Sequence, residues 1–167
     1  MQIRLAKTEE LHILEQLARQ IWPNTYATII SPAQIEFMLD LMYSFDTLRT
    51  QKEQGHEFYI ISNHVQDIGF LALEWIDDSQ QSGSSQLKIN KLYVLDEFQG
   101  KGIGTTLLKK AKARAAETQC KVIFLQVNKA NSAKNFYLKL GFQVREEAIF
   151  NIGNGFVMDD YIMELPL

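Results

Sequence analysis

Apolar residues recur at helical spacing near the start of the chain. A short strand is expected at Ile3–Ala6, and Thr8 then stands where a helix would be capped. Apolar residues follow at intervals that place them on one face of this helix: Leu11, Leu14, Leu17, Ala18 and Ile21. The aromatic segment Trp22–Tyr26 contains a proline, and we expect it to link this helix to the next one.

Two more helices are predicted before the first long strand. Ser31 is expected to cap one of them, with Pro32 at its first position and Gln34 completing a Ser-x-x-Gln capping box. Its buried face would consist of Ile35, Leu39 and Met42. A short helix over residues 46–54 would end at Gly55, since glycine commonly stops helices.

The remainder of the chain predicts strands interrupted by two helices. The expected strands are Phe58–Ser62, Ile68–Ile76, Leu87–Leu95, Lys121–Val127, Phe142–Phe150 and Phe156–Leu165. The expected helices cover residues 104–118 and 132–140, and Asp77–Gln86 is expected to form a polar loop. Hairpins combined with one strand–helix–strand crossover predict an α/β fold of the α+β type. Its mixed, mostly antiparallel sheet would have about seven strands, with helices on both faces.

Composition narrows the class of protein. The length of 167 residues suits a single domain spanning residues 1–167. One cysteine, Cys120, rules out an internal disulfide and is compatible with a cytoplasmic protein. A net charge of −3 argues against a nucleic-acid partner, and no apolar run is long enough to span a membrane. The scattered histidines His12, His56 and His64 predict no metal site.

A glycine-rich turn after a predicted strand is the most informative stretch. Gly100, Gly102 and Gly104 lie between that strand and a helix, where free backbone N–H groups and the helix dipole favour an anion such as a diphosphate. Thr105 stands where the dinucleotide fingerprint needs a glycine, and the chain has no P-loop pattern. A glycine-rich helix start without a ligand is the alternative.

The pattern Gln99-x-x-Gly102-x-Gly104 resembles the diphosphate loop of the GCN5-related N-acetyltransferase (GNAT) family, which binds acetyl-coenzyme A. The resemblance implies an acetyl-coenzyme A-dependent enzyme that acetylates an amine, and no metal. It also implies that the preceding strand bulges away from the next one, so that the pantetheine arm fits between them. The implied cofactor-binding residues are Leu92, Tyr93, Val94, Gln99, Gly100, Lys101, Gly102, Ile103, Gly104, Thr105 and Asn131.

A second similarity lies about 30 residues downstream. There Asn131 precedes a predicted helix bearing Phe136-Tyr137, and Gly141-Phe142 follow it, as in the second signature of the family. The resemblance implies that Tyr137 protonates the departing thiolate and that the Val94 N–H stabilises the oxyanion. An amphipathic core tyrosine is the alternative for Tyr137, and a plain turn residue is the alternative for Asn131.

Acceptor chemistry is less well defined. An acceptor ammonium must lose a proton before it can attack, and Glu74, a carboxylate in an apolar strand, is the candidate relay. A solvated strand face or a water chain is the alternative. Trp22, Tyr26, Phe150 and Phe156 are candidates for the acceptor pocket, or else for core or dimer contacts.

Several partners and functions remain open from the sequence. The closing segment Gly155–Met163 resembles bacterial family members that include polyamine and peptide acetylators, so the expected acceptor is a small-molecule or peptide amine. A homodimer is compatible with the sequence. The competing functions are a non-catalytic acyl-coenzyme A sensor on the same fold and a nucleotide-binding interaction protein.

Overall fold

The computed structural model describes residues 1–77 and 85–167. Most of the predicted loop Asp77–Gln86 therefore lies outside the described residues. The elements are β1 (Gln2–Leu5), η1 (Thr8–Glu10), α1 (Leu11–Tyr26), α2 (Pro32–Tyr43), α3 (Phe45–Glu53), β2 (Glu57–Ser62), β3 (Asp67–Ile76), β4 (Gln86–Val94), η2 (Asp96–Phe98), α4 (Ile103–Glu117), β5 (Val122–Asn128), α5 (Ala133–Lys139), β6 (Gln143–Gly153) and β7 (Phe156–Pro166).

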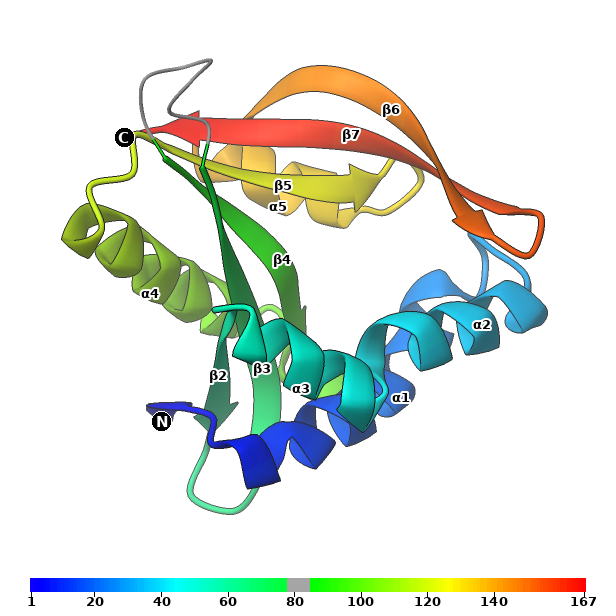
Figure 1. Cartoon of the computed structure of the whole chain (residues 1–167), viewed down its shortest axis with the longest axis horizontal. Helices are drawn as coiled ribbons and strands as arrows, with labels where there is room; N and C mark the ends of the chain where they lie inside the picture. Colours follow the sequence, from blue (N-terminus) through cyan, green and yellow to red (C-terminus); the bar gives the residue numbers. More distant parts are fainter. Residues whose placement is uncertain (78–84) are drawn as a thin grey trace.

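The strands form one mixed sheet in the order β1-β2-β3-β4-β5-β7-β6. Only β4 and β5 run parallel among these neighbours, because α4 carries the chain across between them. Figure 1 shows α1, α2 and α3 on one side of the sheet and α4 and α5 on the other. The seven strands and the helices on both faces confirm the predicted fold class.

Two apolar cores lie on opposite faces of the sheet. Phe58, Ile60 and Phe70 pack against α1–α3, whereas Leu71 and Leu73 pack on the side of α4. Adjacent residues of β3 thus point to opposite faces, as the period of a strand requires. Helices therefore cover both faces of the sheet next to the functional site.

The start of α1 differs from the prediction. Thr8 begins a single 3-10 turn, and α1 starts at Leu11 without a side-chain cap. The carboxylate of Glu10 closes this turn instead, because it accepts the Lys7 N–H at 2.9 Å. The apolar stripe is as predicted, since Leu11, Leu14, Leu17, Ala18 and Ile21 are all buried.

The end of α1 also differs, because the helix continues through Pro23 to Tyr26. An internal proline costs a helix about 3 kcal/mol. Trp22 and Tyr26 lie one turn apart on the buried face, and each buried side chain contributes roughly 1.5–3 kcal/mol, which offsets that cost. The predicted linker is therefore helix.

The predicted capping box of α2 is half formed. Ser31 accepts the Gln34 N–H at 3.1 Å, but the Gln34 side chain donates to the Val157 carbonyl at 2.8 Å. That contact ties α2 to β7, and it replaces the reciprocal bond of the box. Ile35 and Leu39 are buried as predicted, and Met42 is partly buried.

Candidate active site

A bulge in β4 opens the sheet. Ala72 pairs with Lys91 and Leu73 with Ile89, so Asn90 is an extra residue without an opposite partner on β3. The parallel pairing of β4 with β5 ends at the same level, at Ile89 and Leu125. Beyond this point the two strands diverge (Figure 1), and a cavity of about 990 Å³ lies where they separate.

The main chain of Val94 faces this opening. Leu95 N–H donates to the Ile68 carbonyl, and the register pairs Val94 with Gly69. Hydrogen-bonded and non-hydrogen-bonded pairs alternate in an antiparallel ladder, so Val94 turns its N–H and carbonyl away from β3. The Gln99 side chain accordingly donates to the Val94 carbonyl at 3.1 Å. Val94 can therefore offer a backbone donor to a ligand in the cleft.

The glycine turn forms one end of the cleft. Gly100 and Gly102 have φ values of +72° and +79°, and nothing lies within 4 Å of a Cβ built on either residue. Gly102 is the N-cap of α4, so the first N–H groups of this helix have no helical acceptor. These features make an anion site, and the sequence-predicted residues Gln99, Gly100, Gly102, Ile103, Gly104 and Thr105 all line the cleft.

Lys101 is placed differently from its glycine neighbours. Its ammonium lies 5.2 Å from the centre of the Phe98 ring, and the residue is exposed and outside the cleft lining. Contact between Lys101 and a cofactor therefore stays a prediction. A mobile exposed side chain still adds positive charge near the glycine turn.

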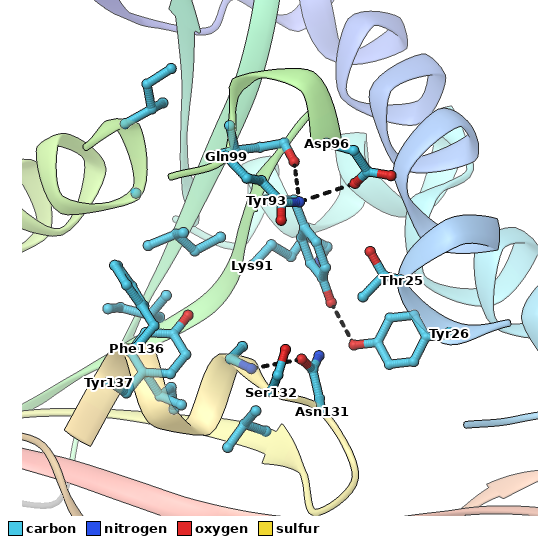
Figure 2. Close-up of a pocket in the computed structure, with 18 of the residues that line it drawn as sticks. Thr25, Tyr26, Lys91, Tyr93, Asp96, Gln99, Asn131, Ser132, Phe136 and Tyr137 are labelled. Atoms are coloured by element: carbon cyan, nitrogen blue, oxygen red, sulfur yellow. Dashed lines mark hydrogen bonds between the residues drawn. The ribbon is translucent and has the colours of Figure 1, made fainter. Parts of the chain in front are cut away.

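Tyr137 comes from α5 into the middle of the cleft (Figure 2). The residue is 7% exposed, and burial, with a smaller effect of Tyr26, raises the pKa of its phenol above the usual value. The hydroxyl therefore keeps its proton across the physiological pH range. At the start of α5 the Asn131 side chain accepts the Ala133 N–H at 2.9 Å, so it orders the turn that leads into the helix.

Tyr26 and Tyr93 meet on the other side of the cleft. Their hydroxyls are 3.0 Å apart, which Figure 2 shows as a dashed line. Tyr26, Leu92, Tyr93 and Asn131 all line the cleft. The structure thus brings together residues from α1, β4, α4 and α5 that are distant in the sequence.

Three predicted acceptor residues lie outside the cleft lining. Trp22 is buried in the core, where its indole N–H donates to the Tyr43 hydroxyl at 3.2 Å. Phe150 is partly buried against the core on the side of α1–α3, and Phe156 packs near Phe37. Each ring fills apolar space next to a helix, which is the alternative that the sequence left open.

Glu74 belongs to a polar cluster next to the cleft. Its carboxylate accepts from the Asn90 side chain at 2.9 Å and lies 3.8 Å from His56 and 3.9 Å from Lys88. Asn90 lines the cleft, whereas Glu74 does not. The Asn90 amide thus lies between the Glu74 carboxylate and the cavity.

Lys91 is a buried residue of the cleft wall that the sequence analysis missed. It is 2% exposed, and its ammonium donates to Asn90 at 2.7 Å and to Gln51 at 3.1 Å. Burial, reinforced by Lys88, lowers its pKa to about 7. The bulge at Asn90 shifts the alternation of β4 and turns Lys91 toward α3, and the sequence pattern does not reveal that shift.

Asp160 on β7 belongs to the acidic pair Asp159-Asp160, for which the sequence leaves two interpretations open, steering of a cationic acceptor and ordinary solvated surface. It is 7% exposed, and burial, with a smaller effect of Asp159, raises its pKa to about 6. A sequence clue was present, because Asp160 alternates with Met158 and Ile162 on one strand face. Among residues 1–77 and 85–167, no group of acidic, histidine or cysteine side chains could hold a metal ion. No helix in that same part of the chain is long and apolar enough to cross a membrane.

Comparison with known proteins identifies relatives along the whole chain. The family model described as acetyltransferase (GNAT) domain matches residues 54–144. A spermidine N(1)-acetyltransferase of Thermoplasma acidophilum is 29% identical over 165 residues, which cover 95% of this chain and 96% of that protein. An N-acetyltransferase in the pepI 3' region of Lactobacillus delbrueckii is 27% identical, with 91% of both chains covered.

Solved structures agree with these matches. The crystal structure of PaiA N-acetyltransferase from Thermoplasma acidophilum in complex with coenzyme A superposes with a TM-score of 0.79. The two chains are 29% identical, and all of both is covered. A GCN5-related N-acetyltransferase from Rhodopseudomonas palustris has a TM-score of 0.81 at 18% identity, covering 99% of this chain and 95% of that one. This second likeness concerns the fold alone.

Proposed function

The chain belongs to the GNAT family and is an acetyl-coenzyme A-dependent N-acetyltransferase, and from this premise we propose that its acceptor is a primary amine of a polyamine or a peptide. The arrangement that carries the proposal is the cleft between β4 and β5, where the Val94 N–H, the glycine turn and Tyr137 converge. Family membership favours an enzyme over the non-catalytic sensor and the nucleotide-binding protein.

The cleft fits acetyl-coenzyme A. Gly100 and Gly102 leave room for a diphosphate close to the backbone, and the start of α4 provides donors for it. The unpaired edge of β4 beyond Ile89 offers main-chain partners for an amide-bearing arm. Acetyl-coenzyme A supplies the acetyl group as a thioester, which an amine can attack.

Residues of this chain would then act on the two ends of the thioester. The Val94 N–H donates to the carbonyl oxygen as negative charge develops there, and such a donor contributes about 3 kcal/mol to catalysis. The Tyr137 hydroxyl gives its proton to the departing sulfur, since its raised pKa keeps it protonated. Asn131 holds the turn before α5 in place and so fixes the position of Tyr137.

Acceptor binding is assigned to the side of the cleft at Tyr26. Trp22 supports this residue from the core, with their ring centroids 4.4 Å apart. Glu74 remains the predicted acceptor for the proton of the acceptor ammonium, which a water chain would carry to it, while the Asn90 amide holds the carboxylate in place. Replacing Glu74 by Gln would keep the Asn90 contact and remove the carboxylate, so a lower kcat at unchanged acetyl-coenzyme A affinity would support this role.

A panel of amines tests the proposal. The purified chain is incubated with acetyl-coenzyme A and, in turn, spermidine, single amino acids, short peptides and simple monoamines, and thiol release is followed. Amine-dependent release with polyamines or peptides is the expected result. Release that no amine on the panel increases, while calorimetry shows coenzyme A binding, would contradict the proposed acceptor class.

A further inference from the structure

Asp160 carries a buried carboxylate oxygen without a partner. The residue is 7% exposed, and its Oδ1 accepts no hydrogen bond from the described part of the chain. Lys129, which follows β5, is engaged by other carboxylates, at 2.8 Å from Asp159 and 2.6 Å from Glu147. A buried acceptor left unpaired is costly, so its presence needs an explanation.

Sheet register places Asp160 on the same face of the sheet as Gln126, a residue of the cleft lining. Asp160 pairs with Asn128 on β5, and Ile162 pairs with Gln126. Residues two apart on a strand share a face, so Asp160 and Gln126 face the same side of the sheet. Gln126 lines the cleft, whereas Asp160 lies one strand farther from it, outside the lining.

Tyr26 is a cleft residue on which Asp160 has an electrostatic effect. Burial raises the pKa of the Tyr26 phenol, and the negative charge of Asp160 adds to this effect. Tyr26 in turn influences Tyr137, whereas Asp160 does not contribute to the shift of Tyr137. Tyr26 lines the cleft, so the charge of Asp160 acts on a hydroxyl that a bound acceptor can reach.

We propose that Asp160 binds a second, non-reacting ammonium of the acceptor and so makes the enzyme selective for diamines and polyamines over monoamines. This inference rests on the proposed function. The reacting nitrogen must be close to Tyr137 and must lose its proton, which excludes a tight ion pair at that position. An ammonium farther along the same molecule keeps its charge, and the unpaired Oδ1 offers it an acceptor. The raised pKa of about 6 leaves the carboxylate ionised at pH 8.

Putrescine and butylamine are suitable probes, because they share a carbon chain and differ by one ammonium. Steady-state kinetics at pH 8 compare the wild type with Asp160→Asn and with the matched control Asp159→Asn, which removes an exposed charge on the next residue. We expect Asp160→Asn to raise the KM for putrescine about 10-fold or more. The KM values for butylamine and acetyl-coenzyme A should stay within about two-fold, and Asp159→Asn should resemble the wild type.

Several results would overturn the inference. An unchanged KM for putrescine in Asp160→Asn would do so, and so would an equal rise for both amines. The inference is also overturned if the wild-type enzyme acetylates butylamine as well as putrescine. This comparison needs no variant, so the inference stays testable if Asp160→Asn folds poorly. Failure of the proposed function has a different signature, namely coenzyme A binding without acetylation of either amine.

Discussion

Replacing Asp160 by Asn is expected to change stability in a pH-dependent way. The folded protein raises the pKa of this carboxyl from 3.8 to about 6, because burial disfavours its charge. A raised acid pKa stabilises the folded state below the unfolded value, and this stabilisation is lost as pH rises through about 6. The wild type therefore bears a cost of about 1.6 kcal/mol at pH 5 and about 3 kcal/mol at pH 8, at 1.36 kcal/mol per pKa unit.

The groups that face Asp160 set the expected size of this effect. Asp159 is its acidic neighbour on β7, Asn128 pairs with it on β5, and the charge of Asp160 acts on Tyr26 of α1. The amide of an asparagine carries its own burial cost, but that cost does not depend on pH. The gain in unfolding free energy should therefore be about 1.4 kcal/mol larger at pH 8 than at pH 5.

Urea or thermal unfolding at the two pH values measures this difference. For a chain of this size the gain in Tm should differ by about 3–6 °C between pH 5 and pH 8. Asp159→Asn is the control and should show no comparable pH dependence, since Asp159 is exposed and paired with Lys129. A gain for Asp160→Asn that is equal at both pH values would refute the claim that a buried charge is held at this position.

Three other changes probe separate parts of the account. Tyr137→Phe should lower kcat about 100-fold or more while leaving the coenzyme A Kd unchanged by calorimetry, and unchanged turnover would remove Tyr137 from the mechanism. Gly69→Ala should lower the free energy of unfolding by about 1–3 kcal/mol in a denaturant titration, because the alanine Cβ would lie 2.6 Å from the Tyr93 carbonyl oxygen. A variant as stable as the wild type would contradict that close approach. Lys91→Met should raise the unfolding free energy by about 2–3 kcal/mol more at pH 6 than at pH 9. The fold lowers the pKa of this ammonium from 10.5 to about 7, so the charged lysine destabilises the wild type as pH falls. Unfolding free energies of both proteins that change with pH in parallel would argue against this.

Local patterns in the sequence predicted the fold and the glycine turn that lines one end of the cleft. The spacing of Leu11, Leu14 and Leu17 and the glycine turn at Gly100–Gly104 depend on neighbouring residues alone, so they could be interpreted without tertiary information. The helix through Pro23 could not, because its stability comes from core contacts of Trp22 and Tyr26.

The acceptor side was harder to predict for the same reason. Trp22 is close in sequence to Tyr26, which lines the cleft, but packing directs the Trp22 ring into the core. Asp160 and Lys91 acquire their properties from strand register and from the bulge at Asn90, which bring distant residues together. Strand alternation alone cannot locate a bulge. The sequence therefore did not show on which face of the sheet Lys91 and its neighbours lie.

A crystal structure of the chain with coenzyme A is the most direct test of the central claim. We expect the diphosphate to contact the backbone N–H groups of Gly100–Gly104, the pantetheine arm to run along the free edge of β4, and the sulfur to lie within hydrogen-bonding distance of the Tyr137 hydroxyl. Coenzyme A bound elsewhere, or a sulfur remote from that hydroxyl, would contradict the account.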